Sequence, residues 1–167
     1  MDNRVGAGGP EVAMAVIPVK ACLRDSYRMI DTYAILDPGS NVYFCSTSSM
    51  RQLGYERRRL KLKMDVMDVR HIMYTHELKN IGIYDLKQEQ TFGLPLLYAK
   101  DRIPTSKHHI PIQEDIAKCS HLEGVDLPQI DAEIGLLLRN HVCDVYSPLE
   151  FKVGPPGSPH ATRTRLG

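Results

Sequence analysis

Apolar residues are grouped along the chain in ways that predict a protein built mainly from β-strands. Residues 12–20 are almost all apolar and rich in β-branched side chains, which favours a strand. Pro18 lies inside this run and places the strand near a sheet edge or a bulge. A polar turn follows, and residues 29–36 return as a second apolar run. The beginning of the chain therefore predicts a β-hairpin, and Asp37 directly follows its second strand.

The next part of the chain predicts a short helix and a second hairpin. Residues 46–53 are compatible with a helix, because Ser and Thr are available as N-caps and Gly54 follows as a C-terminal stop. Residues 59–68 alternate charged and apolar side chains, which is the pattern of a strand with one solvated face. Residues 71–86 continue as one or two further strands. The two adjacent runs indicate an exposed hairpin.

The second half of the chain predicts less regular structure. Residues 92–124 are repeatedly interrupted by Gly and Pro, so we expect mostly irregular surface segments there. Only residues 112–119 resemble a helix, directly after Pro111. The apolar run at residues 132–138 predicts a core strand. The fold class expected from these patterns is mainly β, with one or two short helices.

Composition places the chain among ordinary globular proteins. Its 167 residues, 43% of them hydrophobic, suffice for one domain with a sizeable core. The net charge of +1 gives no overall field toward nucleic acid or anionic lipid. No apolar segment approaches the roughly 20 residues that span a bilayer, so no membrane partner is expected. The cysteines lack a CxxC pattern and are interpreted as reduced thiols of an intracellular protein: Cys22, Cys45, Cys119 and Cys143.

The two ends differ in composition from the middle of the chain. Residues 1–10 are Gly-rich and are expected to be a disordered N-terminal segment. Residues 11–153 form the expected domain. Residues 154–167 are rich in Pro, Gly and Arg with little to bury, and are expected to be a flexible C-terminal linker. The abrupt end suggests an excised piece of something longer.

Several common kinds of site find no support in the sequence. No HExxH pair is present, and Cys119 with His121 lacks a second pair at zinc-finger spacing, so neither a metal nor a cofactor is expected. No GxSxG motif or glycine-rich phosphate loop after a strand occurs. The basic run at residues 56–63 is best explained as a solvated strand face. An RNA-associated module using residues 57–63 is a weaker interpretation, and we expect no direct nucleic-acid binding because no aromatic residue is interleaved.

Asp37 is the strongest candidate for chemistry. The apolar strand before it leads into the turn residues Pro38, Gly39 and Ser40. A purely local explanation is available, because an Asp that opens a turn commonly accepts backbone hydrogen bonds. The functional explanation needs two carboxylates about 3 Å apart, which share one proton and so form an acid-base pair. Since the chain has one such element, the second Asp would come from a second copy across a two-fold axis.

Separated motifs resemble the retropepsin-like aspartic peptidase domain encoded in the pol region of Pao/BEL-type retrotransposons. The resemblance extends from about residue 17 to residue 167. It rests on the following motifs: IPVK at 17–20, AILDPGSNVYFC at 34–45, RQLG at 51–54, IPIQEDIAKCSHLEGVDLPQIDAEIGLLL at 110–138, and SPLEFKVGPPGSPHATRTRLG at 147–167.

This resemblance implies a closed, pepsin-half β-barrel that dimerises and cleaves the element's own polyprotein. Asp37 matches the catalytic Asp, Gly39 the glycine whose backbone N–H supports the carboxylate, and Ser40 the small polar residue that follows. Residues 60–83 would contain the flap over the substrate, and residues 135–138 match the strand beneath the active-site loop. The implied location is the cytoplasm or a virus-like particle, and residues 154–167 would lead into the next polyprotein region.

Two positions depart from the family pattern. Relatives have Thr or Ser where this chain has Pro38, and proline has neither the hydroxyl nor the N–H that locks the two active-site loops together. Relatives have Gly at Arg139, so the arginine side chain must turn outward or displace the loop. We therefore expect a correct fold with weakened or absent peptidase activity. The alternative is a catalytically inactive β-rich dimerisation or folding module of a retrotransposon polyprotein.

Overall fold

A computed structural model describes residues 15–55, 59–66, 69–105, 107–139 and 143–167. The helical segments are short: α1 (Thr47–Gln52), α2 (Gln113–Ala117), α3 (Cys143–Tyr146) and the 3-10 turns η1 (Lys107–His109) and η2 (Ser120–Leu122). The strands are β1 (Val16–Leu23), β2 (Met29–Asp37), β3 (Tyr43–Ser46), β4 (Leu60–Val66), β5 (Val69–Thr75), β6 (Glu77–Leu78), β7 (Ile81–Tyr84), β8 (Thr91–Gly93), β9 (Leu97–Lys100), β10 (Ile134–Arg139), β11 (Glu150–Lys152) and β12 (Ala161–Arg163).

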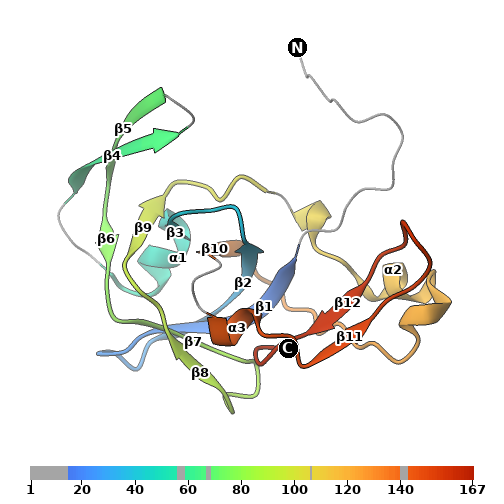
Figure 1. Ribbon diagram of the computed structural model, residues 1–167. Helices are drawn as coiled ribbons and strands as arrows, with labels where there is room; N and C mark the ends of the chain where they lie inside the picture. Colours follow the sequence, from blue (N-terminus) through green and yellow to red (C-terminus); the bar gives the residue numbers. More distant parts are fainter. Residues whose placement is uncertain (1–14, 56–58, 67–68, 106, 140–142) are drawn as a thin grey trace.

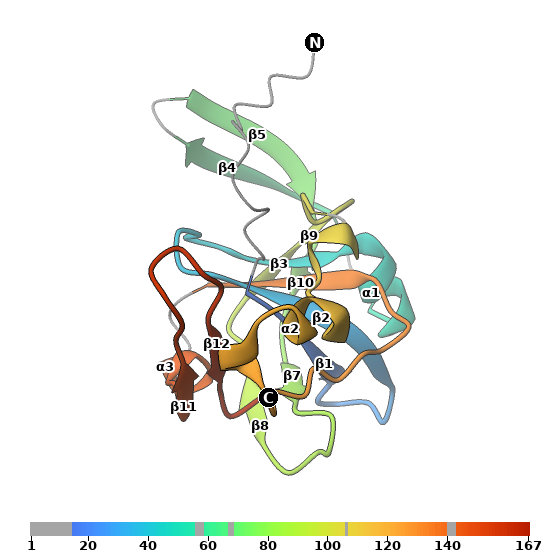
Figure 2. The ribbon, with the colours of Figure 1, turned by 90° about the vertical axis from the view of Figure 1, so that its right-hand side faces the viewer.

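The protein is mainly β, and its principal sheet curls into a half-barrel (Figure 1). The described strands form this sheet in the order β6-β9-β3-β10-β2-β1-β7-β8. Because β6 and β8 are its two edges, the sheet of described strands is an open half-barrel, whereas the family resemblance implied a closed barrel. Two smaller two-stranded sheets, β4-β5 and β11-β12, lie outside it. The view turned by 90° shows β4-β5 at one end of the molecule and β11-β12 on one side (Figure 2).

The first hairpin forms as the sequence predicts. β1 and β2 are antiparallel over their whole length, from the Val16–Ile35 pair to the Cys22–Met29 pair. β7 pairs with β1 only at residues 20–23, so Pro18 lies where β1 has a single neighbour. The missing N–H of Pro18 therefore costs no ladder hydrogen bond on the open side.

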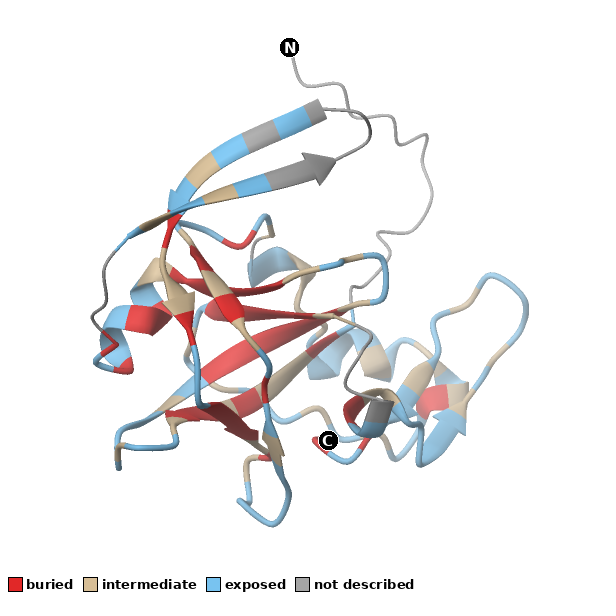
Figure 3. Cartoon of the chain, turned by 60° about the vertical axis from the view of Figure 1, so that its left-hand side comes forward, coloured by how far each residue is buried: buried red, intermediate tan, exposed pale blue. Residues whose placement is uncertain are grey.

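The core lies on both faces of β2 and β10. Residues 32–36 and 134–138 are all buried, as Figure 3 shows for the centre of the sheet. Ile35 and Leu137 belong to one apolar cluster, whereas Ala34 and Leu136 belong to the other. This alternation explains why the runs are continuously apolar, because each face of the sheet needs its own apolar side chains.

The predicted helix at residues 46–53 is α1. The Ser46 side chain accepts a hydrogen bond from the Ser49 N–H at 3.1 Å and so caps its beginning. Gly54 follows the helix with a φ of +71°, a conformation that favours glycine. The second predicted hairpin is also confirmed, since β4 and β5 pair from Leu60–Thr75 to Val66–Val69.

Two segments differ from the expectation. Residues 92–124 were expected to be mostly irregular, but β9 lies within them and pairs with β3 and β6 in the principal sheet. The residues after Gly154 were expected to have little to bury, yet Leu166 is 2% exposed and packs in the main core cluster. The same segment contains β12. The expected disordered segment at residues 1–10 lies outside the described residues.

Three cysteines among the described residues carry no disulfide. Cys22, Cys45 and Cys119 are free thiols. Burial raises the pKa of the Cys45 thiol to about 12, so this thiol is neutral and unreactive near neutral pH. Cys45 therefore contributes to packing rather than to chemistry. Among the described residues, no helix is long and apolar enough to span a membrane.

Candidate active site

Asp37 is placed by the packing of the strand that ends with it. β2 runs between β1 and β10, and the parallel pairing with β10 sets Arg139 beside Asp37. The four residues before Asp37 are buried, whereas Asp37 itself is half-exposed. Since both neighbouring strands fix the path of β2, which Figure 1 shows in the central sheet, Asp37 is held at the end of this strand.

The turn after Asp37 is held by short-range hydrogen bonds. The Gly39 N–H donates to Asp37 Oδ1 at 2.9 Å, and the Ser40 N–H donates to the Asp37 carbonyl at 3.3 Å. The Ser40 hydroxyl donates to the Val42 carbonyl at 2.8 Å. A Cβ at Gly39 would lie 3.3 Å from Asp37 Oδ1, so a larger residue would press on the carboxylate. The Gly39 contact is the support that the family resemblance implies.

The hydrogen bonding leaves part of the carboxylate open. Within the described part of the chain, the Gly39 N–H is the only donor to the Asp37 side chain. Oδ2 is therefore available to water or to another carboxyl group. The Gly39 hydrogen bond alone does not decide between a local turn role and a catalytic role for Asp37, because an Asp that merely opens a turn makes the same bond.

Arg139 turns outward across the Asp37 turn. Its Nη1 donates to the Asn41 carbonyl at 3.1 Å. Considering only residues that the structure describes, no ion pair joins its guanidinium to Asp37. Of the two outcomes expected for this arginine, the structure has the outward one. Arg139 therefore ties the end of β10 to the loop between β2 and β3.

Tyr146 is a site residue that the sequence analysis missed. Its hydroxyl donates to the Leu138 carbonyl at 2.5 Å, at the end of β10. Burial raises the pKa of the Tyr146 phenol, and the nearby Tyr43 and Asp37 raise it further. The phenol is therefore neutral and can donate, as the contact with Leu138 requires.

The β4–β5 hairpin lies outside the principal sheet, at the top of the views in Figures 1 and 2. Leu60, Leu62 and Met73 are half-buried and share one face of the hairpin, as the strand pairing requires. The family resemblance implies a flap within residues 60–83, and the hairpin found there occupies residues 60–75; its role as a flap stays a prediction.

A pocket of about 360 Å³ lies near the site but does not include Asp37. It is bounded by α1 and by the base of the β4–β5 hairpin, and its lining includes Arg51, Arg59, Tyr74 and Asp101. Hence the pocket is not a substrate cleft over the carboxylate. Over the described residues, no group of three or more His, Cys, Asp or Glu side chains could hold a metal ion.

Comparisons with known proteins neither support nor oppose an assignment. No family model, no curated protein and no solved structure matches this chain.

Proposed function

We propose that the chain is a retropepsin-like aspartic endopeptidase of a retroelement, which acts as a homodimer on the element's own polyprotein. The observation that carries this proposal is the Asp37 carboxylate at the end of a buried central strand, with Oδ1 held by the Gly39 N–H and Oδ2 open. The buried strand supports the proposal because it fixes the backbone that presents this carboxylate.

Two Asp37 side chains, one from each subunit, would supply the chemistry. At about 3 Å the two carboxylates cannot both ionise, so one holds a proton and the other is charged. The ionised carboxylate takes a proton from water while the water oxygen attacks the peptide carbonyl. The protonated carboxyl gives its proton to the carbonyl oxygen. Transfer of a proton to the nitrogen then allows the C–N bond to break.

A dimer would also supply the missing cleft. The pocket beside α1 excludes Asp37, and in the proposed dimer the substrate site at the carboxylate would form between the two copies. Exposed apolar side chains at and beside β11 offer a surface for such association: Phe151 lies in the strand and is 57% exposed, and Leu149 and Val153 flank the strand and are 52% and 73% exposed. The β4–β5 hairpin would cover the substrate with its apolar face.

Pro38 and Arg139 weaken the proposed activity. Pro38 has neither a hydroxyl nor an N–H that could form a hydrogen bond across the two-fold axis. Each buried group left without its hydrogen bond costs about 1–3 kcal/mol of dimer stability, and the two-fold symmetry makes this loss occur twice. Arg139 holds the Asn41 carbonyl and so places a cation beside the turn. These two residues favour the second candidate function, a catalytically inactive module that folds and dimerises within the polyprotein.

Peptide cleavage by the purified chain tests the proposal. Incubation with a peptide library at about pH 4 to 6, where a carboxyl dyad shares its proton, should show weak cleavage that Asp37→Asn abolishes. The double variant Pro38→Thr with Arg139→Gly should cleave faster. Strong cleavage by the unmodified chain would refute the weakening, and no cleavage by either form would favour the inactive module.

Sedimentation at several concentrations tests the dimer separately. We expect reversible association that Phe151→Ser weakens, because the change removes an apolar side chain that is 57% exposed on β11. A chain that stays monomeric at every concentration would exclude the two-subunit mechanism.

A further inference from the structure

The β4–β5 hairpin has an outer face that differs sharply from its apolar face. The strand register places Lys61 opposite Tyr74 and Lys63 opposite Ile72. Directly paired residues lie on the same face of a two-stranded sheet. We define the outer face by these four residues: Lys61, Lys63, Ile72 and Tyr74.

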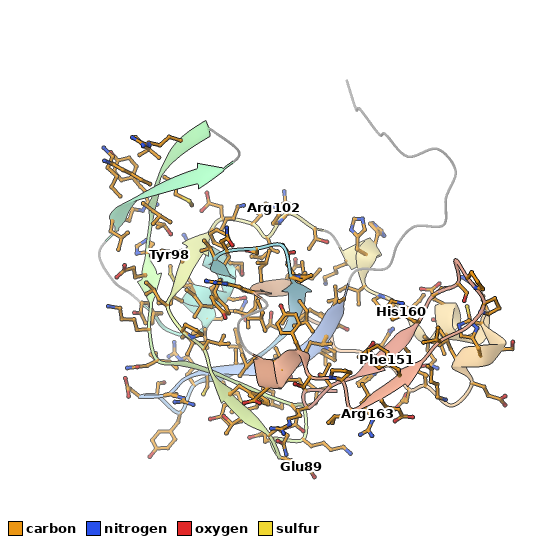
Figure 4. All side chains as sticks on the ribbon, viewed as in Figure 1. Glu89, Tyr98, Arg102, Phe151, His160 and Arg163 are labelled. Atoms are coloured by element: carbon orange, nitrogen blue, oxygen red, sulfur yellow. The ribbon has the colours of Figure 1, made fainter. Side chains whose placement is uncertain are left out.

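The side chains of the outer face are well exposed. Tyr74 is 68% exposed and Ile72 is 53% exposed, and both lysines are exposed as well. Figure 4 shows nitrogen-bearing side chains projecting from this hairpin, away from the half-barrel. Tyr74 and Ile72 therefore form an exposed apolar pair beside two lysines and have no role in the core.

The pocket beside α1 continues this surface at the base of the hairpin. Tyr74 belongs both to the outer face and to the pocket lining, and Arg59 and Arg51 bring two further cations to it. Asp101 is the acidic residue of the lining, and it accepts a hydrogen bond from the Thr47 hydroxyl at 3.2 Å. The combined surface is therefore cationic around an aromatic ring.

The cations of this surface are not neutralised by neighbours. As far as the structure describes the chain, Arg51, Arg59, Lys61 and Lys63 take part in no ion pair. Elsewhere the chain does pair its lysines, as Lys20 with Asp31 at 2.7 Å. Four unpaired cations within one surface create a local positive potential although the chain as a whole has a charge of only +1.

We propose that the outer face and the adjoining pocket bind single-stranded nucleic acid. Arg59, Lys61 and Lys63 would contact successive phosphates, and Tyr74 would stack on a base, which is the combination that single-strand binding uses. The sequence pattern argued against this partner because the basic run contains no aromatic residue. The fold supplies the missing ring from the opposite strand, since Tyr74 pairs with Lys61.

An acidic peptide is the competing partner, and the aromatic ring decides between the two. Lysines and arginines attract any polyanion, but stacking on an exposed ring needs a flat base. The pocket of about 360 Å³ beside Tyr74 also falls within the size range of small-molecule sites, so it can admit a nucleotide. The proposal does not depend on peptidase activity, because it involves neither Asp37 nor its turn.

Fluorescence anisotropy with a labelled oligouridylate tests the proposal on the full chain. We expect saturable binding that weakens with rising salt, with a log-log slope of about −2 for three phosphate contacts to a single strand. Tyr74→Ala should lower the affinity about ten-fold, whereas Tyr74→Phe should keep it because stacking needs the ring and not the hydroxyl. Loss of affinity in Tyr74→Phe equal to that in Tyr74→Ala would overturn the stacking assignment.

Charge variants complete the test. Lys61→Glu with Lys63→Glu should abolish binding, and the matched pair Lys87→Glu with Arg165→Glu, which makes the same charge change at exposed positions away from the hairpin, should leave it intact. Circular dichroism checks that each variant is folded. Equal loss in both pairs, or tighter binding of a labelled polyglutamate that ignores Tyr74→Ala, would overturn the proposal and favour general charge attraction or an acidic protein partner.

Discussion

The two hairpins of this chain have similar strand lengths but opposite surroundings. β1–β2 lies within the principal sheet, with β7 along part of β1 and β10 beside β2. β4–β5 forms a separate two-stranded sheet and exposes Ile72 and Tyr74. The first hairpin holds one carboxylate in a fixed place, whereas the second presents a row of side chains to solvent.

This difference indicates how the two candidate sites would work. Acid-base chemistry needs a carboxylate positioned to within a fraction of an ångström, and burial of the four residues before Asp37 provides that. Binding of a flexible strand tolerates looser positions, because phosphate attraction and stacking have broad geometric requirements. Stability measurements on variants of both regions test whether the first hairpin is packed more tightly than the second.

The largest contrast should come from leucine truncations. Leu138 is fully buried in β10, so Leu138→Ala should lower the free energy of unfolding by about 2–5 kcal/mol. Leu62 is half-buried on the separate hairpin, and Leu62→Ala should cost less than about 1 kcal/mol. Urea denaturation measures both values. Equal losses would show that the β4–β5 hairpin packs as tightly as the sheet.

Two strand glycines give a second, smaller contrast. A Cβ at Gly135 would lie 2.1 Å from the Ser49 hydroxyl and 2.4 Å from that of Thr32, both in buried residues. Gly135→Ala should therefore lower the free energy of unfolding by about 1–3 kcal/mol, because the buried side chains beside β10 cannot move away to accommodate a methyl group.

Gly93 provides the matched control for this prediction. A Cβ there would lie 2.9 Å from the end of the exposed Arg24 side chain, which can move. Gly93→Ala should change stability by less than about 0.5 kcal/mol. If thermal unfolding shows the same shift for both glycines, packing around Gly135 is looser than the distances indicate.

Elements whose signals are local could be predicted from the sequence. The β1–β2 hairpin, the α1 helix with its Ser46 cap, and β10 all follow from periodicity and cap residues. β9 could not be predicted, because it has only four residues and closely follows Pro95. Its place depends on pairing with β3, more than 50 residues earlier in the chain.

The candidate site also contains features that could be predicted from the sequence and features that could not. A backbone hydrogen bond to Asp37 was expected from local turn chemistry, and the outward direction of Arg139 was one of two outcomes expected from the departure from the family pattern. The contact of Tyr146 with β10 could not be predicted, since it depends on how the chain folds back after Arg139. Tyr74 was missed as a partner of the basic run for a similar reason, because only the register places it beside Lys61.

Removal of the Tyr146 hydroxyl should weaken the Asp37 end of the first hairpin. Tyr146→Phe loses the bond to the Leu138 carbonyl, and the free energy of unfolding at neutral pH should fall by about 0.5–1.5 kcal/mol. The pKa of Tyr146 is raised in the folded chain, so above its ordinary value of 10.0 the unfolded state loses a proton that the folded state keeps. Stability from this group is therefore present below pH 10 and falls as the pH rises.

The variant should lack this alkaline loss, so the stability difference between Tyr146→Phe and the unmodified chain should shrink above pH 10. Denaturant titrations at neutral and alkaline pH measure the difference. The Cys45 thiol, whose pKa burial raises to about 12, contributes equally to both proteins and cancels. A difference that grows with pH would mean that the Tyr146 phenol ionises more easily in the folded chain.

The smallest effect should come from the candidate catalytic residue itself. Asn at position 37 keeps a side-chain oxygen that can accept the Gly39 N–H, so Asp37→Asn should change the free energy of unfolding by less than about 0.5 kcal/mol. Asp37→Ala removes the acceptor and should cost about 1 kcal/mol. Chemical denaturation of both variants at neutral pH measures these values. A large loss in Asp37→Asn would mean that the charge supports the turn, and the local explanation of this carboxylate would then be favoured over the catalytic one.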